Sequence, residues 1–393
     1  MWACLRRRIS HVRILCQSGI DLSVSDSDGK TAAHWAAVGG DVECVQELER
    51  MSRKQPNLVV FMCSADKLGR TPLHIAACEG QVAVTMELAR ISAESATLGL
   101  DACDNDGRSA LHWAVTQGRA ACAAILVRMG ADRDVADIHG ARPLHYAVQK
   151  GQLECVMVLV REGVTGGAKG ADLNAKDSLE RTVAMWAAVE GRHEAWKMVL
   201  GMGADIEIPD AAGLTVLHAA TSAGHTSLAL HCLHLQPSLL QRRDNRGRTP
   251  LHLAAAFNRA DLAALLLREG ADVTARDASG RTACHWAAAV GAAEVVDLLM
   301  RAGGDPNAID LLGTSVLHEA AWCGDPETVR TVVAWGGDLA KEDGGGRVAM
   351  HWAALRGVAG AVEVVAGMGG GVNKMESGDE VSCARVGNNQ IGC

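Results

Sequence analysis

Asp66-Lys67-Leu68-Gly69-Arg70-Thr71-Pro72-Leu73-His74-Ile75-Ala76-Ala77 is the stretch that decides the fold, because variants of it return along most of the 393 residues. A second clean copy runs from Asp244 to Ala255, and looser copies open at Asp26, Asp104, Asp137, Asp177, Asp210, Asp277, Asp310 and Asp343. A unit of about 33 residues is too short to bury its own apolar face, so it must stack on copies of itself. The sequence therefore predicts a repeat architecture rather than one core around a catalytic pocket.

Each position of the repeat has a structural reason. Thr71 suits a helix N-cap, and Pro72 suits the first helical position, where a missing N–H costs nothing. Gly80 suits a left-handed helix end, and apolar pairs such as those in residues 263–267 indicate a second helix. The Asp-x-x-Gly opening is typical of a tight turn. One unit is therefore helix, turn, helix and hairpin.

A histidine column recurs at one position of the unit: His34, His74, His112, His145, His218, His252, His285, His318 and His351, with Met185 in one copy. Stacked units would place these rings about 10 Å apart, too far to share a metal ion. We therefore expect each histidine to hydrogen-bond the turn of an adjacent copy. The tryptophans that follow the column are expected to pack between units, with ligand contact as the alternative: Trp35, Trp113, Trp186, Trp286 and Trp352.

From residue 26 to about residue 373 these motifs resemble the ankyrin repeat family. The resemblance implies an all-α repeat fold, an ankyrin-type solenoid of stacked helix–turn–helix units with β-hairpin tips, which binds other macromolecules. It implies no particular partner, because this surface has been adapted to many unrelated targets.

The register predicts three parts of the chain. Residues 1–25 are expected to be an incomplete leading repeat or N-terminal edge, residues 26–373 an array of about ten ankyrin repeats, and residues 374–393 a disordered tail. Two explanations of the leading part stay open: Trp2 and Leu5 form an improvised cap, or the natural protein extends further. Longer connections are expected around residues 55–63, 92–100 and 163–170.

Composition favours a soluble protein of the cytoplasm, with the nucleus as the alternative. The 13 cysteines form no Cys-x-x-Cys pair, and no secretory signal or stretch of 18 apolar residues is found. The net charge of −8 argues against general attraction to nucleic acid. We therefore expect neither nucleic-acid binding nor membrane insertion.

Catalytic and metal-binding patterns are weak. Gly29-Lys30-Thr31 matches the end of a phosphate-binding loop, but Val24 stands where the leading glycine is needed. His225, His231, Cys232 and His234 cluster without a second cysteine to complete a zinc site. We expect no enzyme activity, no cofactor and no metal.

The remaining function is binding of a protein partner, as a scaffold or adaptor. From the family's contact positions we expect apolar contacts at Leu311, Leu312 and Trp322, then contacts at Arg246, Arg248, Phe257, Lys67, Leu68 and Arg70. A recurring base between the turn glycine and the Thr column is either a set of arginines paired with the aspartate of the same turn or a docking stripe for an acidic partner. The alternative function is the regulatory or substrate-docking region of a larger protein, such as a membrane protein acyltransferase, channel or ubiquitin-ligase subunit.

Glycines crowd the last copy, over residues 343–373. Each glycine inside a helix costs roughly 0.5–1 kcal/mol relative to alanine. We predict that this copy frays first, so that its amides lose hydrogen-exchange protection before those of the two preceding copies. Uniform protection across the last three copies would contradict the prediction.

Overall fold

The computed structural model describes residues 1–18, 20–53, 62–94, 99–161 and 170–369, and the chain divides into two compact units. The first unit comprises Met1–Leu239 and the second Leu240–Cys393. The predicted tail and most of the three predicted long connections lie outside the described residues. Each unit is a stack of helix pairs, as the repeat pattern predicts.

The first unit begins with α1 (Trp2–Leu5) and α2 (Ile9–Gln17). Its later helix pairs are α3 (Ala32–Gly39) with α4 (Val42–Ser52), α6 (Pro72–Glu79) with α7 (Val82–Glu94), α8 (Ala110–Thr116) with α9 (Ala120–Arg128), α10 (Pro143–Lys150) with α11 (Leu153–Val160), α12 (Val183–Glu190) with α13 (His193–Gly201), and α14 (Val216–Ala223) with α15 (Thr226–Leu235). The predicted leading repeat therefore contains a shortened first helix, α1, which packs against α3.

The second unit has the same order. Its pairs are α16 (Pro250–Ala256) with α17 (Ala260–Arg268), α18 (Ala283–Ala289) with α19 (Ala293–Arg301), α20 (Val316–Cys323) with α21 (Pro326–Ala334), and α22 (Ala349–Arg356) with α23 (Ala359–Gly367). A short 3-10 helix, η2 (Pro237–Gln241), precedes them. In the last pair the buried residues are small: Ala349 and Ala353 in α22, and Ala361 and Val365 in α23.

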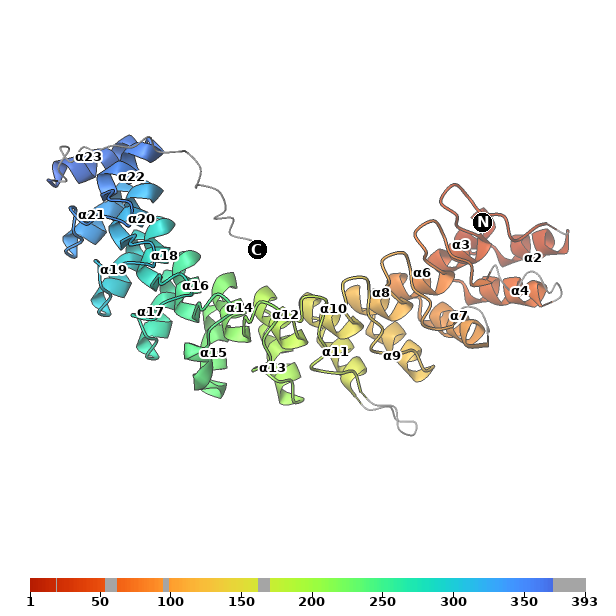
Figure 1. Cartoon of the computed structure of the whole chain (residues 1–393). Helices are drawn as coiled ribbons and strands as arrows, with labels where there is room; N and C mark the ends of the chain where they lie inside the picture. The colour runs from red at the N-terminus through yellow and green to blue at the C-terminus, as the bar shows by residue number, and fades with distance from the viewer. Residues whose placement is uncertain (19, 54–61, 95–98, 162–169, 370–393) are drawn as a thin grey trace. The chain divides into compact units, whose positions relative to one another are not determined.

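Within each unit the first helices lie side by side in one row and the second helices in another (Figure 1). Small residues on the first helices allow this close approach: Ala76 and Ala77 of α6, like Ala254 and Ala255 of α16, are fully buried. Leucines and valines of the second helices complete the core between the rows. The apolar seam that the repeats share is thus the core of each unit.

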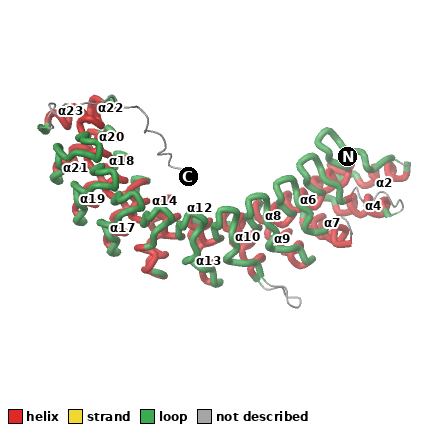
Figure 2. The backbone as a smooth tube through the Cα atoms, in the orientation of Figure 1, coloured by secondary structure: helices red, strands yellow, loops and turns green. Residues whose placement is uncertain are grey.

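The projecting turns bind one another through their backbones. At the turn opened by Asp66, the N–H of Lys67 donates to the carbonyl of Asp28 at 2.9 Å, and the N–H of Asn105 donates to the carbonyl of Leu68 at 3.0 Å. A side chain at Gly69 would meet Asn105 within 2.6 Å, so this close approach requires glycine. Among the described residues the predicted hairpins contain isolated bridges, such as Cys103 with Ser109, and no strand (Figure 2).

Candidate functional site

The histidine column joins each repeat to the next. In α6, Nδ1 of His74 accepts the backbone N–H of Thr71 at 3.1 Å and lies 2.8 Å from its hydroxyl oxygen. Since Nδ1 accepts, the proton is on Nε2, which donates to the carbonyl of Arg108 at 2.9 Å. The same pattern recurs at His34, His112, His252, His285 and His318. This confirms the predicted bond to the turn of an adjacent copy.

These histidines are held neutral. The ring of His112 is fully buried, and burial lowers its pKa to about 4. Burial also lowers the pKa of His145 and of His285 to about 4. A buried imidazole with both nitrogens hydrogen-bonded is a structural link and not a proton-transfer group.

The tryptophan column has a second partner that the sequence did not reveal. In α12, the indole N–H of Trp186 donates to Oδ2 of Asp177 at 2.9 Å, and Arg181 Nε donates to the same oxygen at 2.8 Å. The Arg181 guanidinium also lies over the indole, 5.1 Å from its centroid. We call this arrangement of turn aspartate, base and indole the triad.

Complete or partial triads occur along both units. The indole N–H bond to the turn aspartate recurs at Trp35, Trp113, Trp286 and Trp352, and Tyr146 donates its hydroxyl to Asp137 in the same way. Neighbouring members of the column also touch, since the rings of Tyr146 and Trp186 lie 5.8 Å apart, edge to face. The predicted packing between repeats is confirmed at Trp186 and Trp352, which also lie edge to face with His145 and His318 of the preceding repeats.

The row of bases is largely neutralised inside the chain. The side chains of Arg70, Arg181, Arg248, Arg281 and Arg347 each form an ion pair with the aspartate of the same turn. Only 16% of the Arg248 side chain is exposed. Same-turn pairing, the first of the two interpretations above, is therefore what the structure shows, whereas Arg246 remains exposed at its turn.

The other predicted contact residues fall into three groups. Leu311 and Leu312 are 76% and 74% exposed at one turn tip, and Trp322 lies half-buried on the helix of the same repeat. Phe257, the residue that follows α16, belongs with Arg246 and Arg248 to another repeat of the second unit. Lys67, Leu68 and Arg70 form a tip of the first unit, where Leu68 is 57% exposed. Trp322 is not free, because Trp352 packs edge-on against it at 5.8 Å and Arg356 lies 5.2 Å above it.

Sequence reasoning recognised the repeat at residues 310–342 but missed two unusual residues within it. Thr314 stands where most other repeats have the base, and Glu319 stands where five of them have the indole. Burial, with a smaller contribution from the neighbouring Asp310 and against the opposing effect of Arg281, raises the pKa of Glu319 to about 7. Both substitutions could have been seen by aligning the fourth and ninth residues after each turn aspartate.

One of the histidines of α15 is hydrogen-bonded to a tryptophan of the neighbouring repeat. His231 Nδ1 lies 3.3 Å from the indole nitrogen of Trp196, the donor of this hydrogen bond. Within the described parts of the chain, no cluster of three or more His, Cys, Asp or Glu side chains is arranged to hold a metal ion.

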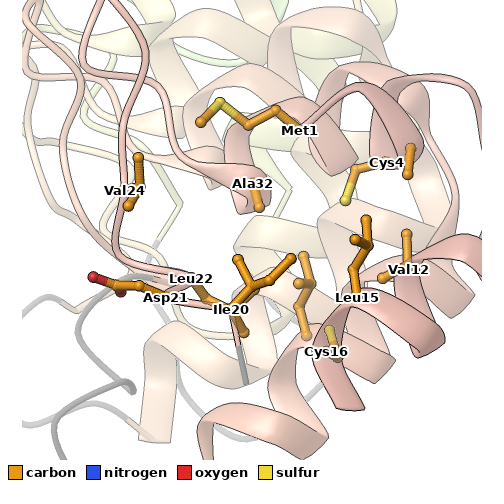
Figure 3. A pocket seen from close by; sticks show the side chains of 12 residues that line it. Met1, Cys4, Val12, Leu15, Cys16, Ile20, Asp21, Leu22, Val24 and Ala32 are labelled. Carbon is orange, nitrogen blue, oxygen red and sulfur yellow. The ribbon is translucent and has the colours of Figure 1, made fainter. Parts of the chain in front are cut away.

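Two cavities lie in the first unit. One of about 110 Å³ opens where Ile75 replaces an indole, between Val38 and Trp113. The other, of about 220 Å³, is apolar and lies between α1, α2 and the loop at Ile20–Val24 (Figure 3). Met1, Cys4, Val12 and Leu15 face it. His74 and Cys78 both line the smaller cavity, but both ring nitrogens of His74 are already hydrogen-bonded.

Family models cover almost all of this chain. A model described as ankyrin repeats (3 copies) matches residues 49–137, 90–177, 129–210, 185–277, 228–310 and 284–376, and one described as ankyrin repeats (many copies) matches residues 1–48. The chain belongs to the ankyrin repeat family. Ankyrin repeats serve protein–protein interaction, so a protein is the expected class of partner.

Curated relatives share parts of this ankyrin chain. "NF-kappa-B inhibitor alpha" of Homo sapiens is 34% identical over 111 residues, which are 27% of this chain and 35% of that protein. "Delta-latroinsectotoxin-Lt1a" of Latrodectus tredecimguttatus is 38% identical over 74 residues, 19% of this chain and 6% of that protein. "Putative palmitoyltransferase ZDHHC13" of Danio rerio is 32% identical over 107 residues, 26% of this chain and 16% of that protein. The match thus spans about a third of the first relative and far less of the other two.

Within the described ranges, no helix combines the length and the apolar character that a bilayer crossing requires.

Proposed function

We propose that this ankyrin chain is a non-enzymatic scaffold or adaptor that holds a protein partner against the turn tips and first helices of its second unit. The observation that carries this proposal is the exposed leucine pair at the tip of the 310–342 repeat. Leu311 and Leu312 expose about three quarters of their surface, although both backbone N–H groups are already bonded within the protein. Exposed apolar side chains on an ordered backbone are typical of a contact surface.

The neighbouring tips leave the leucine pair accessible. The tip before it carries only Ala278 and Ser279, and the tip after it carries Gly344 and Gly345. Leu311 N–H donates to the carbonyl of Ser279 at 3.0 Å, and Gly344 N–H donates to the carbonyl of Leu312 at 2.9 Å. The two leucines therefore stand as a ridge between small residues, a shape that fits an apolar groove on a partner.

The proposal predicts a loss of partner binding in the double variant Leu311→Ser, Leu312→Ser. Removal of two exposed anchors should weaken binding by about 10-fold or more without a change in melting temperature, because neither side chain contributes to the core. Proteins captured by the intact chain would be identified by mass spectrometry, and the affinity of each for both forms would then be measured by calorimetry.

Leu235→Ser provides the matched control, since Leu235 is a half-exposed leucine at the end of α15. It should bind partners as the unaltered protein does. Arg246→Glu tests the predicted basic contact better than Arg248→Glu, because Arg248 is paired with Asp244 and its reversal would disturb the fold. Equal affinity of the leucine double variant and the intact chain would overturn the proposal.

A second candidate function follows from the similarity to the Danio rerio protein, of which the matched segment is 16%. In this case the repeats are the substrate-docking region of a larger protein. Sequencing of the transcript beyond both ends distinguishes the two, since a downstream catalytic or membrane-spanning segment favours the second.

A further inference from the structure

The triads show what each turn aspartate binds. Oδ1 of the aspartate accepts backbone N–H groups within its own turn, as at Asp277, and Oδ2 is left for a side chain. Across the described repeats this second oxygen receives an indole N–H, a phenol O–H or a guanidinium N–H at Asp26, Asp66, Asp104, Asp137, Asp177, Asp244, Asp277 and Asp343.

Two repeats lack this donor. Oδ1 of Asp310 accepts the N–H groups of Leu312 and Thr314, both at 2.8 Å, and its Oδ2 has no hydrogen bond within the described residues. Asp210 is in the same state, with Leu214 and Ala219 at the base and indole positions. Of these two repeats, only the Asp310 repeat also has a second carboxylate at the indole position.

That second carboxylate is Glu319, at the indole position of the column. Its side chain has no hydrogen bond or ion pair with any described residue, and only part of it reaches solvent. Burial of an unpaired carboxylate is unfavourable, which agrees with the pKa of about 7. The charge of Arg281 acts on it, but Arg281 is already held by Asp277 at 3.3 Å and by the ring of Trp286 at 3.9 Å.

The chain itself shows where the missing cation would lie. Arg248 lies in the repeat before Trp286, with its guanidinium 5.9 Å from that ring. Arg108 is placed in the same way 5.5 Å from Tyr146 of the next repeat. Because Thr314 occupies the equivalent position, the ring of Trp352 has Arg347 of its own repeat at 5.4 Å but no base from the preceding one.

We propose that the 310–342 repeat binds an arginine side chain of a protein partner, whose guanidinium takes the place between Asp310, Glu319 and Trp352 that a basic residue of the chain occupies in neighbouring repeats. This inference rests on the proposed partner-binding function and adds the chemistry of one contact. The exposed ridge of Leu311 and Leu312 in the same repeat would hold apolar residues beside that arginine.

Charge and geometry both favour arginine as the occupant. Arg281 and Arg347 are paired with Asp277 and Asp343, and Arg276 donates to the carbonyl oxygens of Gly280 and Ile309, so none of these bases is bonded to the two carboxylates of this repeat. A planar guanidinium can bond a carboxylate and stack on an indole together, as Arg181 does at Asp177 and Trp186. An ammonium group lacks the plane that stacks.

The test uses ethylguanidinium as the probe and neutral ethylurea of nearly the same shape as its control, with the full chain observed by two-dimensional NMR. The indole N–H resonance of Trp352, assigned with a Trp352→Phe variant, and the amide of Thr314 should shift with saturation for ethylguanidinium. We expect binding of ethylurea to be at least about 10-fold weaker, a difference of about 1.4 kcal/mol. The amide of Leu214 in the Asp210 repeat should not shift.

Two variants alter the site in opposite ways. Glu319→Gln removes the charge and should weaken ethylguanidinium binding by about 5-fold or more, whereas Glu294→Gln, the same change on the outer surface of α19, should have no effect. Thr314→Arg supplies the guanidinium from the chain itself and should abolish saturable shifts while raising the melting temperature.

Equal shifts for the two probes, or unchanged binding in both Glu319→Gln and Thr314→Arg, would overturn the inference. Since no partner protein enters this test, its failure leaves the capture experiments with the leucine variant unaffected. Failure of those experiments would in turn leave the guanidinium measurement standing.

Discussion

Acidification from pH 7.5 to pH 4.5 should lower the free energy of unfolding by several kcal/mol. Folding holds the pKa of His112, His145 and His285 at about 4, below the ordinary value of 6.5. The unfolded chain therefore takes up protons first, so the stability is complete above pH 6.5 and is lost as the pH falls towards 4. Over that range the contribution of each of these histidines to the free energy of unfolding falls by roughly 3 kcal/mol, at about 1.4 kcal/mol per unit of pKa shift. Urea unfolding followed by circular dichroism at several pH values measures the loss.

The pH range separates the histidines from the turn aspartates but not from Glu319, whose raised pKa of about 7 stabilises the folded state as the pH falls and offsets part of the histidine loss. Hydrogen bonds and neighbouring arginines lower the pKa of Asp66, Asp177 and Asp343 against the opposing effect of burial, so their contribution is lost only below about pH 3.8. A His285→Met variant, patterned on Met185, should be less stable at pH 7.5 but less sensitive to acid. Equal urea midpoints at pH 7.5 and pH 5 would show that the histidines are not held neutral.

Replacement of Met1 by the four residues Thr-Pro-Leu-His, directly before Trp2, should stabilise the leading repeat by about 2–4 kcal/mol. Arg7 has a positive φ of 54°, as Gly80 has at the end of α6, and this register puts Met1 in the histidine column. The buried leucine that precedes the histidine elsewhere, such as Leu73, has no counterpart within residues 1–393. The apolar cavity between α1 and α2 lies there, and a leucine would fill it (Figure 3).

Hydrogen exchange of the amides in α1 to α4 measures the effect of the extension. A Thr-Pro-Ala-His version supplies the cap and the histidine without filling the cavity, and it should give less than half of the gain. Equal protection with the two extensions would mean that the cavity is not the site of the missing leucine.

The repeat fold and its internal links were predictable because they depend on short-range rules. A cap, a left-handed glycine and a tight turn each involve residues within one unit, and a stack needs only nearest neighbours. The bond from His74 to Arg108 follows from the same register. The tryptophan column was predicted to pack between repeats, and Trp186 and Trp352 do so, but the bonds of the column to the turn aspartates were not predicted.

The candidate site was predictable only in part. Leu311 and Leu312 were recognised from their place at a turn tip, and the structure shows them exposed. In the sequence, the row of bases resembled a docking surface. The ion pairs at Arg248 and Arg281 show that aspartates of the chain itself neutralise most of its charge. Glu319 was not predicted as a site residue, because one acidic residue in a sequence does not indicate a binding site until the positions of the neighbouring side chains are known.

The sequence by itself determined the family, the helix pairs and the order of the turns, because periodic local signals repeat often enough to be unambiguous. Only the tertiary structure decided which charges remain unsatisfied, since that depends on side-chain distances between the turn and the helix of neighbouring repeats. The same Asp-x-x-Gly turn is complete at Asp277 and lacks a donor at Asp310. The physical reason is that charge neutralisation is a property of atoms in contact, whereas the repeat is a property of spacing.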